Sequence, residues 1–220
     1  IRASDWSSDV CSSDLFFTMT ECVINLCGCF NPPTVAHISL LTLARNKLHD
    51  EGFTDCLGFL TPTHSTYSKP GLLDSPTRKA LCELSVEDID WISVNDFEIT
   101  RGEWTKTIIT LKHLQEVNPH RKVFMVCGAD LVYRWNDPVW NPDDVREILD
   151  TFGVIIISRE DISTENITKK IPVMEGHMKN VRIIHENPLE SISSTYVRNL
   201  IHENKSVSGL VVPKVEKYIK

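Results

Sequence analysis

The stretch Gly28-Cys29-Phe30-Asn31-Pro32-Pro33-Thr34-Val35-Ala36-His37 decides how this chain begins its fold. It follows an apolar run at 22–27, which predicts a strand, and it precedes a segment at 36–48 whose apolar residues recur at helical spacing. Free backbone N–H groups and the helix dipole make a helix that starts after a glycine turn a site for phosphate. We therefore expect Thr34 at the N-cap and His37 in the first helical turn to face an anion.

A second hydroxyl-rich turn lies near the other end of the chain. Ser191-Ile192-Ser193-Ser194-Thr195-Tyr196-Val197-Arg198 caps a predicted helix and carries an arginine in its first turn. A guanidinium can grip two phosphate oxygens, and the hydroxyl residues offer further donors. Simple helix capping explains the hydroxyls equally well, and the two roles are compatible.

Strand-like and helix-like segments alternate along the chain, which predicts an α/β fold with a mostly parallel sheet covered on both faces. Ligands of such sheets bind beyond the carboxyl ends of the strands, near a topological switch point. The expected strands are 22–27, 56–60, 91–94, 122–127, 153–158 and 181–185, and the expected helices are 36–48, one opening at Ser75-Pro76, 104–117, 143–151, 194–203 and 213–218.

The two turns together resemble the paired signatures of the nucleotidylyltransferase superfamily. With Cys127-Gly128-Ala129-Asp130 and Pro138-Val139-Trp140, the chain resembles the nicotinamide/nicotinate mononucleotide adenylyltransferases of animals over about residues 23–219. The resemblance implies a Rossmann-like doubly wound sheet. It also implies transfer of AMP from ATP, with Mg²⁺, to nicotinamide or nicotinic acid mononucleotide, which yields NAD or deamido-NAD and pyrophosphate.

The resemblance also assigns roles to residues of this chain. His37 and Arg198 would be catalytic through contacts to ATP phosphates. Two groups would bind the substrates. For ATP these are Gly28, Phe30, His37, Gly128, Asp130, Ser193, Ser194, Thr195 and Arg198; for the mononucleotide they are Cys29, Lys69, Phe97 and Trp140, with Phe97 and Trp140 stacking on the pyridine ring. Without the resemblance, His37 would read as a core histidine and Lys69 as a solvated surface lysine.

The sequence departs from the family pattern in two places. Cys29 stands where the family has serine, and a thiol is the weaker hydrogen-bond donor. The connection 115–121 is short, whereas nuclear relatives carry a long basic insertion there. This favours the cytoplasm or the mitochondrion and leaves nuclear entry open.

Bulk composition fits one globular domain at 19–220, after a leader at 1–18 that we interpret as non-native or disordered. A net charge of −7 gives no support to a nucleic-acid partner, and no apolar run reaches the length of a membrane span. The seven scattered cysteines predict reduced thiols and an intracellular protein, and Cys27-x-Cys29 lacks the second pair that a metal site needs. The oligomeric state, including a homo-oligomer, is left open.

Two rival functions share parts of this pattern. An adenylyltransferase for another phosphate, such as phosphopantetheine, would keep His37 and Arg198 but would have no need of Trp140 and Phe97. A catalytically silent nucleotide-binding or chaperone-like module would be free to lose His37, Lys69 and Arg198. We expect both pyridine mononucleotides to be accepted at comparable rates, because stacking holds the ring without reading its substituent.

Overall fold

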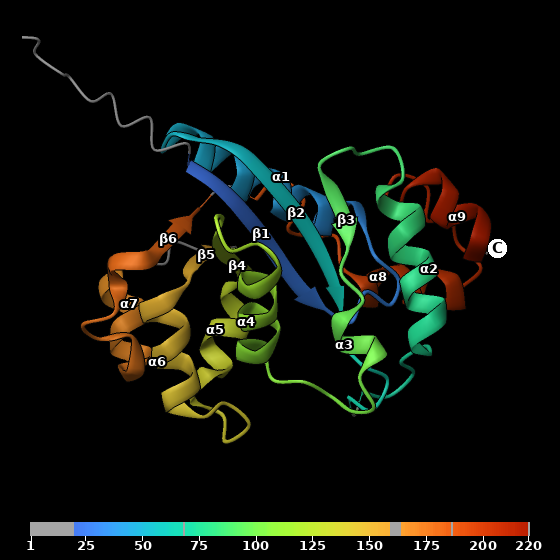
Figure 1. The fold of residues 1–220 in the computed structure, drawn as a ribbon. Coiled ribbons are helices and arrows are strands. Elements are labelled where there is room, and N and C mark those ends of the chain that lie inside the picture. The colour runs from blue at the N-terminus through green and yellow to red at the C-terminus, as the bar shows by residue number, and fades with distance from the viewer. Residues whose placement is uncertain (1–19, 68, 159–163, 186, 220) are drawn as a thin grey trace, which may run out of the picture.

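The computed structural model describes residues 20–67, 69–158, 164–185 and 187–219. The expected leader at 1–18 lies outside these ranges. The described part of the chain forms a six-stranded sheet in the order β3-β2-β1-β4-β5-β6, and every adjacent pair is parallel (Figure 1). The expectation of a Rossmann-like doubly wound α/β fold is confirmed.

The strands lie close to their predicted positions, and each is a run of β-branched or other apolar residues. Their bounds are β1 (Thr20–Gly28), β2 (Phe53–Pro62), β3 (Ile92–Val94), β4 (Lys122–Gly128), β5 (Gly153–Ile157) and β6 (Val181–Ile184).

The helices include several short ones that the sequence pattern does not predict, notably α3, α5 and α7. Their bounds are α1 (Val35–Asp50), α2 (Ser75–Val86), α3 (Phe97–Thr100), α4 (Thr107–Val117), α5 (Ala129–Tyr133), α6 (Pro142–Thr151), α7 (Thr164–Lys170), α8 (Ser194–His202) and α9 (Pro213–Ile219), with 3-10 turns η1 (Arg134–Asn136), η2 (Pro172–Met174) and η3 (Met178–Asn180).

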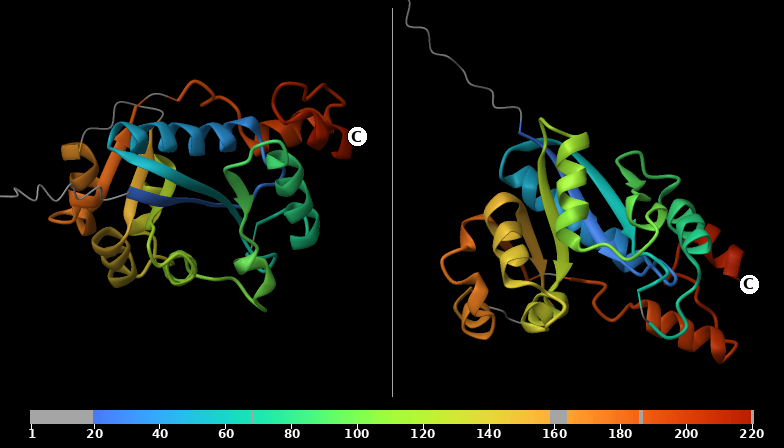
Figure 2. Two further views of the ribbon diagram at one scale, coloured as in Figure 1. Left: turned by 45° about the horizontal axis from the view of Figure 1, so that its top comes forward. Right: turned by 60° about the horizontal axis from the view of Figure 1, so that its bottom comes forward.

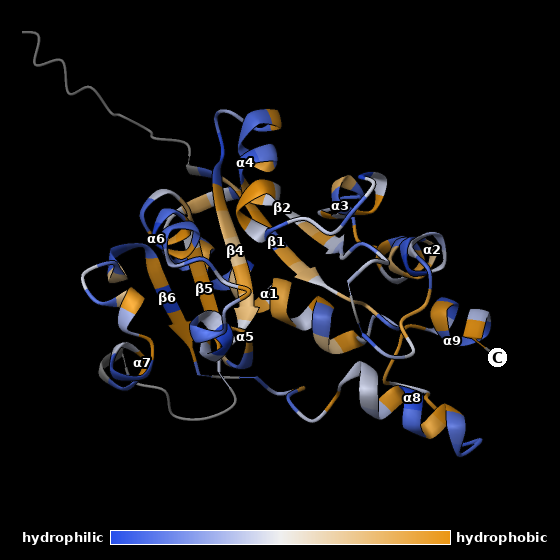
Figure 3. Cartoon of the chain, turned by 90° about the horizontal axis from the view of Figure 1, so that it is seen from below, coloured by the Kyte–Doolittle hydropathy of each residue, from blue (hydrophilic) through white to orange (hydrophobic). Residues whose placement is uncertain are grey.

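Helices cover both faces of the sheet (Figure 2), the strands between them are largely hydrophobic (Figure 3), and an apolar cluster lies on each face. Alternate strand residues such as Val23 and Met125 face α4 and α6, while their neighbours Ile24 and Phe124 face α1 and α2. This is the alternation that a strand imposes on successive side chains. A third cluster joins α2 to α8 and α9, so the C-terminal helices pack beside α2 (Figure 1).

Chain order reverses at β1, which lies between β2 and β4. Leu26 pairs with Val126, and two residues further along each strand come Gly28 and Gly128. Both glycines therefore sit at the carboxyl edge of the switch point, where such sheets bind ligands.

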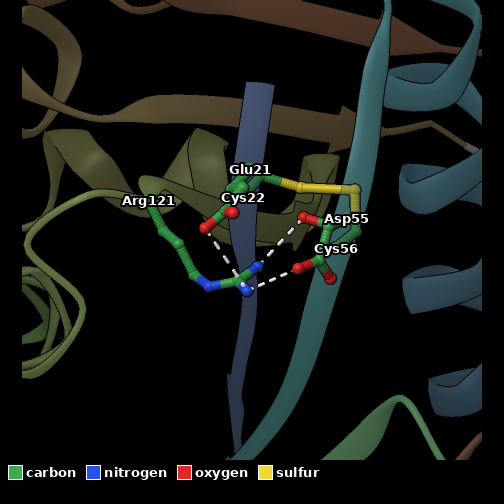
Figure 4. The surroundings of a disulfide bond; sticks show 5 residues. All are labelled: Glu21, Cys22, Asp55, Cys56 and Arg121. Carbon is green, nitrogen blue, oxygen red and sulfur yellow. Dashed lines mark hydrogen bonds and ion pairs between the residues drawn. A yellow bond between two sulfur atoms is a disulfide. The ribbon is translucent and has the colours of Figure 1, made fainter. Parts of the chain in front are cut away.

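Two cysteines correct the expectation that every thiol is reduced. Cys22 and Cys56 are register partners on β1 and β2 and form a disulfide near the opposite end of the strands (Figure 4). Beside it Arg121 makes ion pairs with Glu21 and Asp55. Cys27, Cys29, Cys82 and Cys127 are free.

Candidate active site

A cavity of about 970 Å³ opens at the carboxyl ends of β1, β2 and β4, a size suited to a small-molecule site. Seven of the predicted site residues line it. They are Gly28, Cys29, His37, Lys69, Gly128, Asp130 and Trp140. The topology thus brings together motifs that are separated by more than a hundred residues in the chain.

His37 occupies the third position of α1 and forms a reciprocal cap with Thr34. The Thr34 backbone N–H donates to His37 Nδ1 at 2.9 Å, so the neutral ring carries its proton on Nε2. The ring packs edge-on against Phe30, with centroids 5.0 Å apart. Burial lowers the pKa of His37 to about 4. The imidazole is therefore an uncharged donor at neutral pH.

The turn between β1 and α1 is held by partners from distant segments. Asn31 Nδ2 donates to the Gly71 carbonyl at 2.8 Å, and Arg198 Nη1 donates to the Asn31 carbonyl at 2.9 Å. Ser194 Oγ donates to the Pro32 carbonyl at 2.8 Å. Phe30 completes the turn with a positive φ of 43° and a ring that is buried.

This arrangement changes where several predicted ATP-binding residues lie. Ser193, Ser194, Thr195, Arg198 and Phe30 do not line the cavity. Ser193 caps α8 by accepting from the Tyr196 N–H, and Arg198 Nη2 donates to Thr195 Oγ1 at 3.1 Å. In the structure, the segment 193–198 therefore stabilises the turn between β1 and α1 by hydrogen bonds to its backbone, from outside the cavity lining.

Phe97 also departs from its predicted place. Its ring stacks on His113 with centroids 3.9 Å apart, and the guanidinium of Arg101 lies over it. It does not line the cavity, whereas Trp104 does. Trp104 was expected inside a helix, but it lies in the loop before α4, 6.4 Å from the Tyr67 ring. Trp104 and Trp140 are thus the tryptophans that line the cavity.

Arg78 is a structural residue that sequence reasoning missed. It is fully buried, and its guanidinium donates to the carbonyl oxygens of Leu73, Cys29 and Thr63. One side chain thereby joins the loops that follow β1 and β2. The sequence does contain a signal for this role, because Arg78 is a charged residue on the same face of α2 as the buried residues Leu81, Cys82 and Ser85.

Gly128 and Asp130 approach each other closely at the start of α5. A Cβ added to Gly128 would lie 2.4 Å from Asp130 Oδ1. A glycine is therefore required here if the Asp130 carboxylate is to keep its position at the cavity edge.

Comparison with known proteins identifies the family to which the chain belongs. It belongs to the cytidylyltransferase-like family, whose model matches residues 25–200. Within that family it belongs with the nicotinamide/nicotinic acid mononucleotide adenylyltransferases: the Arabidopsis thaliana protein of that name is 31% identical over 202 residues, covering 88% of this chain and 85% of the relative. A Bos taurus relative with the same activity in its name is 27% identical, covering 91% of this chain and 87% of its own length.

Solved structures agree on the fold. A Plasmodium falciparum nicotinic acid mononucleotide adenylyltransferase complexed with NaAD superposes with a TM-score of 0.67 at 20% identity, covering 90% of this chain and 94% of that one. The same enzyme complexed with APC gives a TM-score of 0.66.

Within the described ranges, no helix combines the length and the apolar character that crossing a bilayer requires.

Proposed function

We propose that this chain transfers AMP from ATP to nicotinamide or nicotinic acid mononucleotide, giving NAD or deamido-NAD and pyrophosphate. One observation carries the proposal: His37, Lys69, Asp130 and Trp140 line a single cavity at the switch point of the sheet. The chain that forms this cavity belongs to the family described above. Lys69 and the His37 donor would face the anionic phosphates, and Trp140 would face the pyridine ring.

The chemistry needs positioning and charge stabilisation more than covalent help. An oxygen of the mononucleotide phosphate attacks the α-phosphorus of ATP, and the bond to the β-phosphate oxygen breaks as pyrophosphate leaves. The Nε2–H of His37 would donate to a phosphate oxygen near the reacting centre. Lys69, exposed at the rim, would neutralise the mononucleotide phosphate.

Mg²⁺ would enter with ATP. Across the part of the chain that the structure describes, no group of three His, Cys, Asp or Glu side chains could hold a metal ion. Magnesium is often bound largely through substrate phosphates and water, so the triphosphate itself can bring the ion. We place the reaction in the cytoplasm or the mitochondrion, with nuclear entry left open, because the 115–121 connection lacks the long basic insertion of the nuclear relatives.

The test is a side-by-side assay with ATP and Mg²⁺, using nicotinamide mononucleotide, nicotinic acid mononucleotide and phosphopantetheine. We expect dinucleotide from both pyridine substrates at comparable rates near pH 7, and none from phosphopantetheine. Turnover of phosphopantetheine with neither pyridine nucleotide accepted would reassign the chain to a sibling activity. ATP binding without turnover of any substrate would indicate a silent module.

A further inference from the structure

Glu98 has a buried carboxyl group in the wall of the cavity, and one of its two oxygens has no hydrogen-bond partner among the described residues. The residue lies in α3 and is 2% exposed. Oε1 accepts a hydrogen bond from Thr110 Oγ1 at 3.0 Å, whereas no described group bonds the buried Oε2. Leaving a buried polar oxygen unpartnered is costly, and native structures retain few such atoms without a reason.

The charged groups around Glu98 are engaged elsewhere. On α2, the guanidinium of Arg78 donates to three backbone carbonyls. At the start of α4, Lys106 is ion-paired with Asp144 at 2.7 Å. On β1, burial raises the pKa of the Cys27 thiol well above its ordinary value, so Cys27 is uncharged.

Other ionisable side chains near α3 also have partners of their own. His113 stacks on the Phe97 ring and Arg101 lies over it, while the N-cap carboxylate of Asp96 is ion-paired with Lys79 at 2.6 Å. None of these groups forms an ion pair with Glu98. Burial raises the pKa of the carboxyl to about 7, with smaller opposing effects from the Thr110 hydrogen bond and from Arg78.

The cavity wall on either side of Glu98 suits a flat ring. Trp104 and Ile108 line it from the α3–α4 side, and Trp140 and Ile148 line it from the α5–α6 side. Phosphate donors and cations lie elsewhere in the same cavity, at Gly28, His37 and Lys69. A mononucleotide with its phosphate at that end would present its pyridine ring to the aromatic walls, and the ring substituent would need a polar partner.

We propose that Glu98 determines specificity for the pyridine substituent, through a hydrogen bond that its carboxyl group makes with the carboxamide or carboxylate of the bound mononucleotide once the side chain turns Oε2 from its buried position into the cavity. The inference rests on the function proposed above. An ionised Glu98 accepts from the amide N–H and repels a carboxylate, whereas a protonated Glu98 donates to a carboxylate oxygen. The enzyme therefore favours the acid substrate at low pH and the amide substrate at high pH, and it accepts both near neutrality.

The experiment lets the two mononucleotides compete for one sample of the full chain, with ATP and Mg²⁺, at pH values from 5.5 to 8.5. The ratio of the two kcat/KM values cancels the titrations of ATP, of the substrate phosphates and of enzyme groups that serve both substrates. We expect the amide-to-acid ratio to rise by about tenfold or more across this range, with a midpoint near 7. A ratio that stays flat in the wild type overturns the proposal.

Three variants separate substrate recognition from a structural role. Glu98→Gln keeps the shape and removes the titration, so the ratio should become independent of pH. Thr110→Val removes the hydrogen bond that stabilises the ionised form, so the midpoint should move to higher pH. Glu103→Gln neutralises an exposed carboxylate nearby and should leave the wild-type profile unchanged.

The possible failures are distinguishable. A pH-dependent ratio that persists in Glu98→Gln would assign the effect to another group and overturn the proposal. Equal losses for both substrates in Glu98→Gln, beside a flat wild-type ratio, would indicate a structural carboxyl. No turnover of either mononucleotide would contradict the proposed function itself, and the inference would fall with it.

Discussion

Arg198 Nη1 lies 2.9 Å from the carbonyl oxygen of Asn31, so the late motif of the chain holds the early one. The two residues are 167 positions apart, and the bond connects α8 to the turn between β1 and α1 that precedes His37. A hydrogen bond from a charged donor contributes about 1.5–3 kcal/mol. The turn that would receive ATP phosphate is thus positioned by a residue from outside the cavity lining.

This relationship predicts different effects for the two basic residues. Arg198→Ala should chiefly raise the KM for ATP and lower kcat, because the β1–α1 turn that would receive the ATP phosphates loses the hydrogen bond from Arg198. Lys69→Ala should chiefly raise the KM for the mononucleotide, because Lys69 lies on the separate loop after β2. Steady-state kinetics with each substrate varied in turn would measure both. Equal effects of both variants on one substrate would contradict the division of roles.

His37→Ala should fold and lose roughly a hundredfold or more in kcat, as expected for a donor that stabilises charge at the reacting centre. His37→Gln, which keeps a donor, should lose less. Because the pKa of His37 is about 4, the free wild-type enzyme should show no loss of kcat/KM from this residue between pH 8 and 5.5. A folded alanine variant with near-wild-type turnover would contradict the assignment.

The same depressed pKa affects stability. The folded-state pKa lies below the ordinary value of 6.5, so the stability that neutral His37 contributes is fully present above pH 6.5 and is lost as pH falls toward 4. The free energy of unfolding of His37→Ala should therefore depend less on pH across this window than that of the wild type. Urea unfolding at several pH values would measure the difference.

The Cys22–Cys56 disulfide should be detectable in the folded protein. Alkylation under denaturing conditions without reductant should leave these two cysteines unmodified, while the four cysteines free in the described structure react. A disulfide that closes a loop of this kind typically contributes about 2–4 kcal/mol, so reductant should lower Tm. The double variant Cys22→Ala/Cys56→Ala is the matched control, because its Tm should not respond to reductant. Modification of all cysteines without reductant would show that the pair is not formed.

Sequence reasoning located the strands and the two capped turns because those signals are local. The run before Gly28 and the capping residues at Thr34 and Ser193 act within one strand or one helical turn. Long-range partners were not predictable, because they depend on register and on loop paths. The pairing of Cys22 with Cys56 follows from strand register, and the stacking of Phe97 on His113 follows from the short helix α3, which has no clear periodicity.

Arg78 shows how much of the site depends on such a long-range partner. Its guanidinium bonds the carbonyls of Leu73, Cys29 and Thr63, and its burial lowers its pKa without neutralising it. Arg78→Met would keep most of the volume but would remove the side-chain donor from three carbonyls, of which that of Thr63 is buried, with no charge left behind. We expect a loss of about 3–5 kcal/mol in the free energy of unfolding, measured by urea titration.

Arg78→Lys is the informative comparison, because a lysine keeps the charge and loses the planar fork that reaches three acceptors. It should fold with a smaller loss of stability, yet the Cys29 and Thr63 loops should no longer be held together. Its KM values for ATP and for the mononucleotide should therefore both rise. If Arg78→Met unfolded at the same urea concentration as the wild type, the guanidinium would not be holding these loops. Wild-type KM values in Arg78→Lys would show that the loops keep their positions without the fork.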